Sequence, residues 1–251
     1  MKFELLACTM TLRARRVMEF PPYLAGNVLR GTFGTLLREV ASPEQYAQVF
    51  EPASINGPSG LRNRPRPFVF RSAALNGRTV QSGEQFCFGV NLFHTREPML
   101  DLWTAAFSRW ADVVSFDSAP VSIDLTPRSE SVSRVRVEFE TPTDLKGSLL
   151  ARARDRVATL QSLYGKAPLT VDFHYLNERA QSIAITRRDL RRIRAIRRSS
   201  RTGQSHDVGG LIGSIEYEGD LAPFLPYLEA AQWTGVGRHC AWGNGQISIH
   251  T

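Results

Sequence analysis

The chain has 251 residues, 42% of them hydrophobic and 22% charged, which suits one large or two small packed domains and argues against disorder. The net charge is +7, and only three of the 31 basic residues are lysines, an arginine bias expected of a polyanion-binding protein or a GC-rich genome. No apolar run reaches membrane-spanning length, and Glu4 interrupts the apolar stretch that a signal peptide would need. The three cysteines are widely spaced, which does not fit a disulfide framework. We therefore expect a cytoplasmic protein that does not span the membrane.

The first half of the chain predicts a β-α-β-β-α-β unit. A helix follows Pro21-Pro22, and its Gly31 and Gly34 predict a closely packed neighbour. The apolar stripe from Leu100 to Trp110 predicts a second helix, and we interpret the stripe as core rather than as an aromatic binding face. Strands are predicted at residues 3–12, 67–70, 85–93 and 113–125, and a loop at 51–66.

The same order of elements is predicted again in the second half. Residues 134–140 alternate between apolar and charged side chains, as in a half-buried strand. Further elements are predicted as a helix at 150–164, a basic strand pair at 181–198 and 208–217, a short helix at 223–231 and a strand at 246–250. We therefore predict an α+β fold with two tandem ferredoxin-like (RRM-like) domains, at residues 1–130 and 131–251.

Positive charge is concentrated in residues 187–201. This segment contains eight arginines and one acidic residue, Asp189, so its charge of +7 equals that of the whole chain. Such a segment is typical of a polyanion-binding surface, and the alternative is a solvated charged hairpin.

A glycine-rich loop lies close to the end of the chain. Two Gly-X-Gly pairs, at 235–237 and 243–245, bracket Arg238 and His239. Glycine lets a backbone turn sharply, and bare amide N–H groups beside an arginine suit a phosphate. The loop resembles the C-terminal glycine-rich loop of the CRISPR-associated endoribonucleases that process precursor crRNA, which belong to the RAMP superfamily. The resemblance covers about the last fifth of the chain, with further matching stretches at 199–204, 209–215 and 219–221, and weaker ones at 29–31 and 141–142.

The resemblance implies tandem ferredoxin-like domains and metal-independent RNA cleavage, in which the ribose 2′-hydroxyl attacks the adjacent phosphate and leaves a cyclic phosphate. Such chemistry needs proton transfer and cations around the phosphate. Our first candidate for proton transfer is His239, which alternatively pins the loop, and the second is His206. Tyr23 is a candidate for orienting the hydroxyl, or else a helix anchor, and Lys146 for reaching the phosphate, or else a surface lysine. The family also places a histidine near the first helix, whereas no histidine precedes His94 here.

The candidate RNA-binding residues are arginines of the basic segment, glycines of the loop and two further arginines. They are Arg30, Arg187, Arg188, Arg192, Arg194, Arg197, Arg198, Arg201, Gly235, Gly237, Arg238, Gly243 and Gly245.

The leading functional hypothesis is therefore an endoribonuclease that cuts CRISPR repeat RNA and acts as a monomer or homodimer. It is expected to need neither cofactor nor metal, and other CRISPR effector subunits are possible partners. The first alternative is a non-catalytic crRNA-binding RAMP subunit of an effector complex. The second is an RNA-binding protein unrelated to CRISPR, in which the arginine segment alone binds.

Overall fold

The computed structural model describes residues 1–52, 64–198 and 203–251, with only the backbone of Arg198. The chain divides into two compact units. We call Leu5–Val121 with Ala241–Gly243 the N-terminal unit, and Met1–Glu4, Ser122–Cys240 and Asn244–Thr251 the C-terminal unit. The boundary between residues 130 and 131 stays a prediction. No helix in the described ranges is long and apolar enough to cross a membrane.

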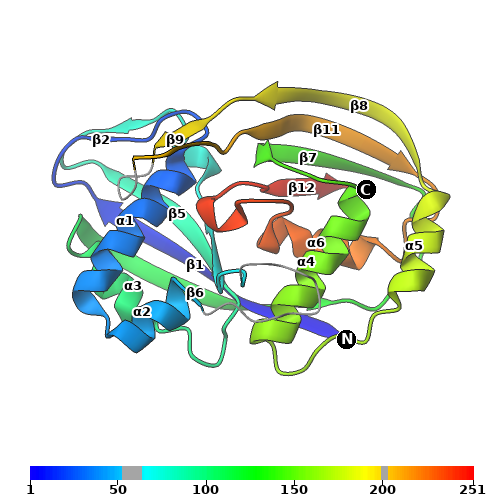
Figure 1. Ribbon diagram of the computed structural model, residues 1–251, viewed down its shortest axis with the longest axis horizontal. Coiled ribbons are helices and arrows are strands. Elements are labelled where there is room, and N and C mark those ends of the chain that lie inside the picture. Colours follow the sequence, from blue (N-terminus) through cyan, green and yellow to red (C-terminus); the bar gives the residue numbers. More distant parts are fainter. Residues whose placement is uncertain (53–63, 199–202) are drawn as a thin grey trace. The chain divides into compact units, whose positions relative to one another are not determined.

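The N-terminal half contains the predicted β-α-β-β-α-β order. Its four-stranded sheet has the order β3-β5-β1-β6, in which the first and third strands lie at the centre, as in a ferredoxin-like fold (Figure 1). The strands are β1 (Lys2–Arg13), β3 (Phe68–Arg71), β5 (Gln85–Leu92) and β6 (Asp112–Asp124), and the two expected helices are α1 (Ala25–Val40) and α3 (Leu100–Phe107). Additional elements are α2 (Pro43–Val49), a 3-10 turn at Ala73–Leu75 and a two-stranded ribbon of β2 (Met18–Glu19) and β4 (Thr79–Val80).

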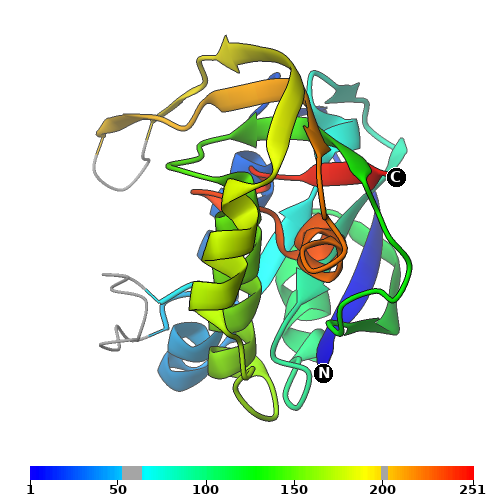
Figure 2. The same cartoon turned by 90° about the vertical axis from the view of Figure 1, so that its right-hand side faces the viewer.

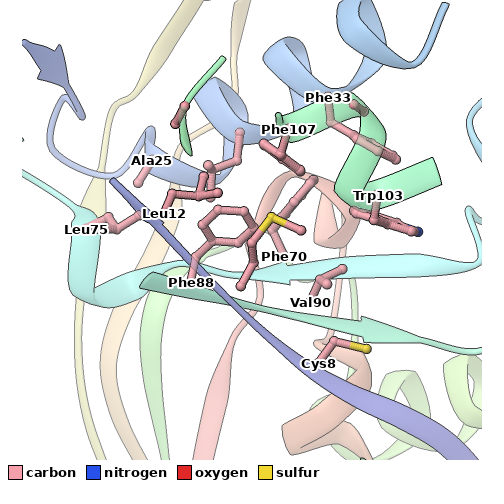
Figure 3. Close-up of a cluster of buried hydrophobic side chains, with 14 of the residues drawn as sticks. Cys8, Leu12, Ala25, Phe33, Phe70, Leu75, Phe88, Val90, Trp103 and Phe107 are labelled. Atoms are coloured by element: carbon pink, nitrogen blue, oxygen red, sulfur yellow. The ribbon is translucent and has the colours of Figure 1, made fainter. Parts of the chain in front are cut away.

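Aromatic side chains form the core of the N-terminal unit (Figure 3). Phe33 of α1 stacks on Trp103 of α3 at 3.9 Å between ring centroids, and both are buried. The stripe on residues 100–110 therefore belongs to the core, as predicted. The helix glycines differ: a Cβ on Gly34 would lie 2.2 Å from the Phe50 ring, whereas one on Gly31 would meet nothing within 4 Å. The close neighbour predicted from both glycines exists only for Gly34.

The C-terminal unit has the same topology. Its sheet order is β12-β7-β11-β8, and in Figure 2 its helices lie together on one side of the sheet. The elements are β7 (Arg134–Thr143), α4 (Leu149–Tyr164), β8 (Ala184–Ile193), β11 (Gly210–Glu218), α6 (Leu225–Thr234) and β12 (Ile247–His250). The tandem ferredoxin-like prediction is therefore confirmed. Val135, Val137 and Phe139 are buried, and the charged residues between them are exposed, as the alternation predicted.

The predicted strand at 181–198 is wrong at both ends. Asp172 caps an additional helix, α5 (Phe173–Gln181), by accepting a hydrogen bond from the amide of Tyr175, so β8 begins only at Ala184. At its other end β8 stops at Ile193, and β9 (Ile196–Arg198) pairs with β10 (Ser205–Asp207) in a separate ribbon. The predicted basic strand pair is thus two consecutive structures, β8 on the main sheet and the β9–β10 ribbon beyond it.

Candidate functional site

The glycine-rich loop is fastened to the segment that joins β7 to α4. The amide of Arg238 donates to the carbonyl oxygen of Asp144 at 3.1 Å, and the amide of Gly245 donates to that of Pro142 at 3.1 Å. Within the loop, the amide of Val236 donates to the carbonyl oxygen of Gly245 at 2.8 Å. Residues 235–239 therefore lie directly against residues 142–145.

Glycine is required in this loop because the backbones approach closely. Gly237 has a φ of +81°, and a Cβ there would lie 2.5 Å from the Asp144 carbonyl oxygen. Gly245 has a φ of +73°, and a Cβ there would lie 2.0 Å from the Val236 carbonyl oxygen. A non-glycine residue would be strained in both conformations and would collide with the backbone.

This packing corrects one part of the sequence interpretation. The amides of Gly235, Val236, Arg238 and Gly245 all donate to carbonyl oxygens of the protein, so they are not the bare phosphate-binding groups that the pattern predicted. Gly237 and Gly245 serve close packing within the protein. What the loop presents outward is the Arg238 side chain, which is 60% exposed.

His239 occupies a strained position at the end of this packed segment. Its φ is +64°, a left-handed conformation that costs a non-glycine residue about 1–2 kcal/mol. The imidazole is half-buried, and this burial, followed by the positive charge of Arg238, lowers its pKa below the usual histidine value. The Asp144 carboxylate acts in the opposite direction. The net effect favours a neutral imidazole, the form that accepts a proton.

Charged groups from three segments surround His239. Arg238 forms an ion pair with Asp144, with Nη1 and Oδ2 3.4 Å apart. Arg197 on β9 and His206 on β10 are close enough for their charges to lower the His239 pKa further. Lys146 is exposed two residues beyond Asp144, and its carbonyl oxygen accepts a hydrogen bond from Nε of Arg152. The C-terminal unit thus gathers an imidazole and several cations at one end of its sheet.

The β9–β10 ribbon is held at its base by two polar side chains that the sequence analysis missed. Oδ1 of Asp207 accepts hydrogen bonds from the amides of Gly209 at 2.8 Å and Ala195 at 3.4 Å. Asn244, 5% exposed, donates from Nδ2 to the Val208 carbonyl oxygen at 2.6 Å and thereby ties the ribbon base to the glycine-rich loop. Neither residue stands out in the sequence, because each is an ordinary turn residue until its distant partners are known.

The predicted basic residues of the segment are placed differently from one another. Arg187, Arg188, Arg192 and Arg194 are exposed, and Arg197 is half-buried. The Arg198 side chain and Arg201 lie outside the described residues. Asp144 was also overlooked, although it adjoins the Thr141-Pro142 match and is the partner that holds Arg238.

Two predicted residues of the N-terminal unit have roles in packing. Arg30 is only 9% exposed, and its guanidinium carbon lies 4.7 Å from the Phe50 ring centroid and 5.0 Å from that of Trp242. A guanidinium enclosed by two rings is poorly placed to bind a surface phosphate, so these contacts favour a packing role, and the assignment of Arg30 as an RNA ligand stays a prediction. Gly243 packs on α1, where a Cβ would lie 3.0 Å from Cα of Gly26.

The remaining candidates stay predictions. Tyr23, in the N-terminal unit, is half-buried with a φ of +62°, a strained conformation just before α1. Within the described part of the chain, no three His, Cys, Asp or Glu side chains gather as possible metal ligands.

A sequence model described as CRISPR-associated endoribonuclease Cas6 matches residues 99–247, and another, described as an N-terminal domain, matches residues 3–113. No curated protein matched. Among solved structures, a Cas6 product complex is similar with a TM-score of 0.59 and 19% identity, covering 99% of this chain and 100% of that one. Thermus thermophilus Cas6 gives a TM-score of 0.59 and 14% identity, covering 100% and 99%. A partial Cas6-RT-Cas1–Cas2 complex gives 0.64 and 13%, covering 98% of this chain and 46% of that one. At these identities the solved structures show a shared fold.

Proposed function

The chain belongs to the CRISPR-associated endoribonuclease Cas6 family, whose model matches more than half of it, and we propose that it cuts the repeat RNA of precursor crRNA without a metal ion. The observation that carries the proposal is the placement of His239 between Arg238 and the charged groups of the β7–α4 segment and the β9–β10 ribbon. A proton acceptor beside cations is what transesterification of an RNA phosphate requires.

In the proposed reaction the nucleophile comes from the substrate itself. The neutral imidazole of His239 accepts the proton of a ribose 2′-hydroxyl, and the 2′-oxygen attacks the adjacent phosphorus. The bond from phosphorus to the 5′-oxygen breaks, and that oxygen takes up a proton. The products carry a 2′,3′-cyclic phosphate and a 5′-hydroxyl, and no bound metal ion is needed to supply the attacking group.

Cations of the same unit stabilise the charge that develops on the phosphate. The guanidinium of Arg238 remains exposed while Asp144 holds it by an ion pair, so it is oriented and still accessible. Lys146 is the second cation of the proposed site, on the segment against which Gly237 packs. Tyr23 is the proposed group that orients the 2′-hydroxyl.

The proposed partners follow from the family. The solved relatives include a Cas6 product complex and a Cas6-RT-Cas1–Cas2 complex, so we propose CRISPR RNA as ligand and other CRISPR proteins as binding partners. A cytoplasmic location is part of the proposal, and the three free cysteines are in keeping with a reducing compartment.

Single-turnover cleavage of repeat RNA in EDTA tests the proposal. Removing a general base typically lowers the rate by ~10²–10⁴-fold, so His239→Ala should lose cleavage to that extent while RNA affinity stays within a few-fold. His174→Ala is the matched control, because this histidine is exposed on α5 of the same unit. Since the pKa of His239 is lowered, the acid limb of the wild-type rate profile should lie below the usual histidine value of about 6.5.

Two outcomes would redirect the assignment. A wild-type rate in His239→Ala would make the histidine structural and move the search to His206, Tyr23 and Lys146. If wild-type protein binds repeat RNA tightly and never cuts it, the non-catalytic crRNA-binding subunit is the better description.

A further inference from the structure

Strand β8 carries much of the arginine segment and lies at the edge of the C-terminal sheet. Among the strands of the described residues it pairs with β11 alone, in a regular antiparallel register from Arg187↔Glu216 to Ile193↔Gly210. Successive side chains of a strand point to opposite faces, so the arginines of β8 form two rows. Arg187 and Arg191 belong to one row, and Arg188 and Arg192 belong to the other.

The register identifies the face of each row. Arg188 is opposite Ile215, which in turn is opposite the buried Val137 on β7, so this row shares the face that the helices cover nearer the sheet centre. Arg187 is opposite Glu216, which is opposite the exposed Arg136, so the other row shares the open face. All four arginines are exposed, because β8 lies beyond the cover of the helices.

The open face is already neutralised by its own carboxylates. Its cross-strand neighbours and the β8 row together provide four arginines and four carboxylates, a formal charge of zero. These residues are Arg134, Arg136, Glu138, Arg187, Asp189, Arg191, Glu216 and Glu218. Arg134 and Glu218 form an ion pair at 3.4 Å, and Arg187 has an acidic residue both directly opposite and two positions along the strand. Arg191 is opposite the buried Ile212, and its acidic neighbour is Asp189, two positions along the same row. A phosphate approaching Arg187 or Arg191 would therefore meet the Asp189 carboxylate as well.

The row on the helix side has apolar cross-strand neighbours. Arg188 and Arg192 are opposite Ile215 and Leu211, and the residue between them is Leu190. The Asp207 carboxylate is close enough for the charge of Arg192 to act on it, and it already accepts hydrogen bonds from the amides of Gly209 and Ala195. This row therefore keeps most of its positive potential.

The same row also leads toward the proposed active site. Leu211, opposite Arg192, is opposite Thr143 on its other side, the last residue of β7. Asp144 follows directly and holds Arg238 by both its carbonyl oxygen and its carboxylate. Two inter-strand steps of about 4.8 Å thus separate Arg192 from the segment against which the glycine-rich loop packs.

We propose that Arg188 and Arg192 form a phosphate-binding track that leads single-stranded RNA to the His239 site, and that Arg187 and Arg191 do not contact it. The inference rests on the proposed function for the identity of the ligand. The new element is that the arginines of β8 have different roles on its two faces. Those on the helix side bind RNA, and those on the open face balance the carboxylates there.

The test compares two double variants that remove equal charge from the same exposed strand, Arg188→Ala with Arg192→Ala and Arg187→Ala with Arg191→Ala. Affinity for a repeat RNA with a 2′-deoxy substitution at the cut site is measured from low to high salt. Each lost phosphate contact on a single strand lowers the salt slope by ~0.7, so the first variant should lose about 1.4 and the second close to nothing. Replacing Arg188 and Arg192 by lysine should restore most of the slope, which also controls for folding.

Equal losses in the two variants, or a larger loss in Arg187→Ala with Arg191→Ala, would overturn the inference. Absence of RNA binding by the wild type would overturn it as well. Cleavage is scored separately on unmodified RNA: if the asymmetry is found and the wild type does not cut, the track stands and the proposed catalytic function fails.

Discussion

The two ferredoxin-like units share one topology and treat their arginines in opposite ways. In the N-terminal unit Arg30 is buried between the rings of Phe50 and Trp242 and extends an aromatic core. In the C-terminal unit the arginines of β8 stand exposed on an edge strand whose neighbours are aliphatic or acidic. The difference teaches that topology does not assign a surface its function; the residues on each strand and helix do so.

The two ribbons show the same contrast. In the N-terminal unit, Met18 of β2 and Val80 of β4 are buried. Backbone hydrogen bonds extend the pairing of these strands, and the Phe20 amide donates to the Arg78 carbonyl oxygen at 2.9 Å. In the C-terminal unit, β10 is exposed, and the base of the β9–β10 ribbon is held by the Asp207 carboxylate and the Asn244 amide. A ribbon fixed at its base by side chains can present its outer surface to a ligand without an apolar core of its own.

Removing the buried arginine should have the largest effect on stability. Arg30→Ala deletes a desolvated cation from between two rings and leaves a cavity, so we expect the free energy of unfolding to fall by about 2 kcal/mol or more. Arg38→Ala on the same helix is the control, since that side chain is 52% exposed and should cost at most about 1 kcal/mol. Urea unfolding measures both.

The contrast between the arginines of the two units fails if Arg30 contributes to RNA binding. The salt slope of RNA binding by Arg30→Ala should remain that of the wild type, whereas the slope of the Arg188 and Arg192 double variant should fall. A slope reduced with unchanged stability would return Arg30 to the RNA-binding surface.

Glycines provide the second comparison. Gly237→Ala forces a left-handed alanine against the Asp144 carbonyl oxygen, which should destabilise the protein by about 1–3 kcal/mol and displace Arg238 and His239. Gly31→Ala in α1 meets nothing within 4 Å and should instead stabilise the helix by about 0.5–1 kcal/mol.

Thermal unfolding and single-turnover cleavage measure the two variants. Cleavage should fall in Gly237→Ala and remain unchanged in Gly31→Ala. Normal cleavage in a destabilised Gly237→Ala would show that the packing of the glycine-rich loop against Asp144 does not position the site.

The smallest effect concerns pH. The amides of Gly209 and Ala195 lower the pKa of Asp207, and the charges of Arg192 and Arg194 act in the same direction. A carboxylate with a lowered folded-state pKa contributes stability that is full above its unfolded value, about 3.9, and is lost as the pH falls through the folded value. The ribbon base should therefore be insensitive to pH between 5 and 8 and should open only in stronger acid.

Amide hydrogen exchange at Ala195 and Gly209 measures this opening. Protection should disappear below the folded-state pKa and should be lost at all pH values in Asp207→Ala, whereas Val80 in the N-terminal ribbon should keep its protection throughout. Unchanged protection in Asp207→Ala would mean that the ribbon does not depend on the carboxylate.

The sequence by itself determined the β-α-β-β-α-β order of each half and the buried faces of its main elements, although not α2, α5 or the two ribbons. Hydrophobic spacing is a local property, so the stripe from Leu100 to Trp110 and the alternation from Arg134 to Glu140 already predicted which faces are buried. The Gly-X-Gly pairs around His239 likewise marked the loop, because positive φ angles leave a local signature in glycine.

Only the tertiary structure decided what the charged and glycine residues touch. The burial of Arg30 depends on Trp242, more than 200 positions away. Two of the amides that the glycine pattern predicted as bare, those of Arg238 and Gly245, donate to the distant residues Asp144 and Pro142. The division of the β8 arginines into two rows depends on which strand pairs with β8 and in what register. Long-range pairing is set by the summed packing of the whole sheet, and no local pattern of arginines contains it.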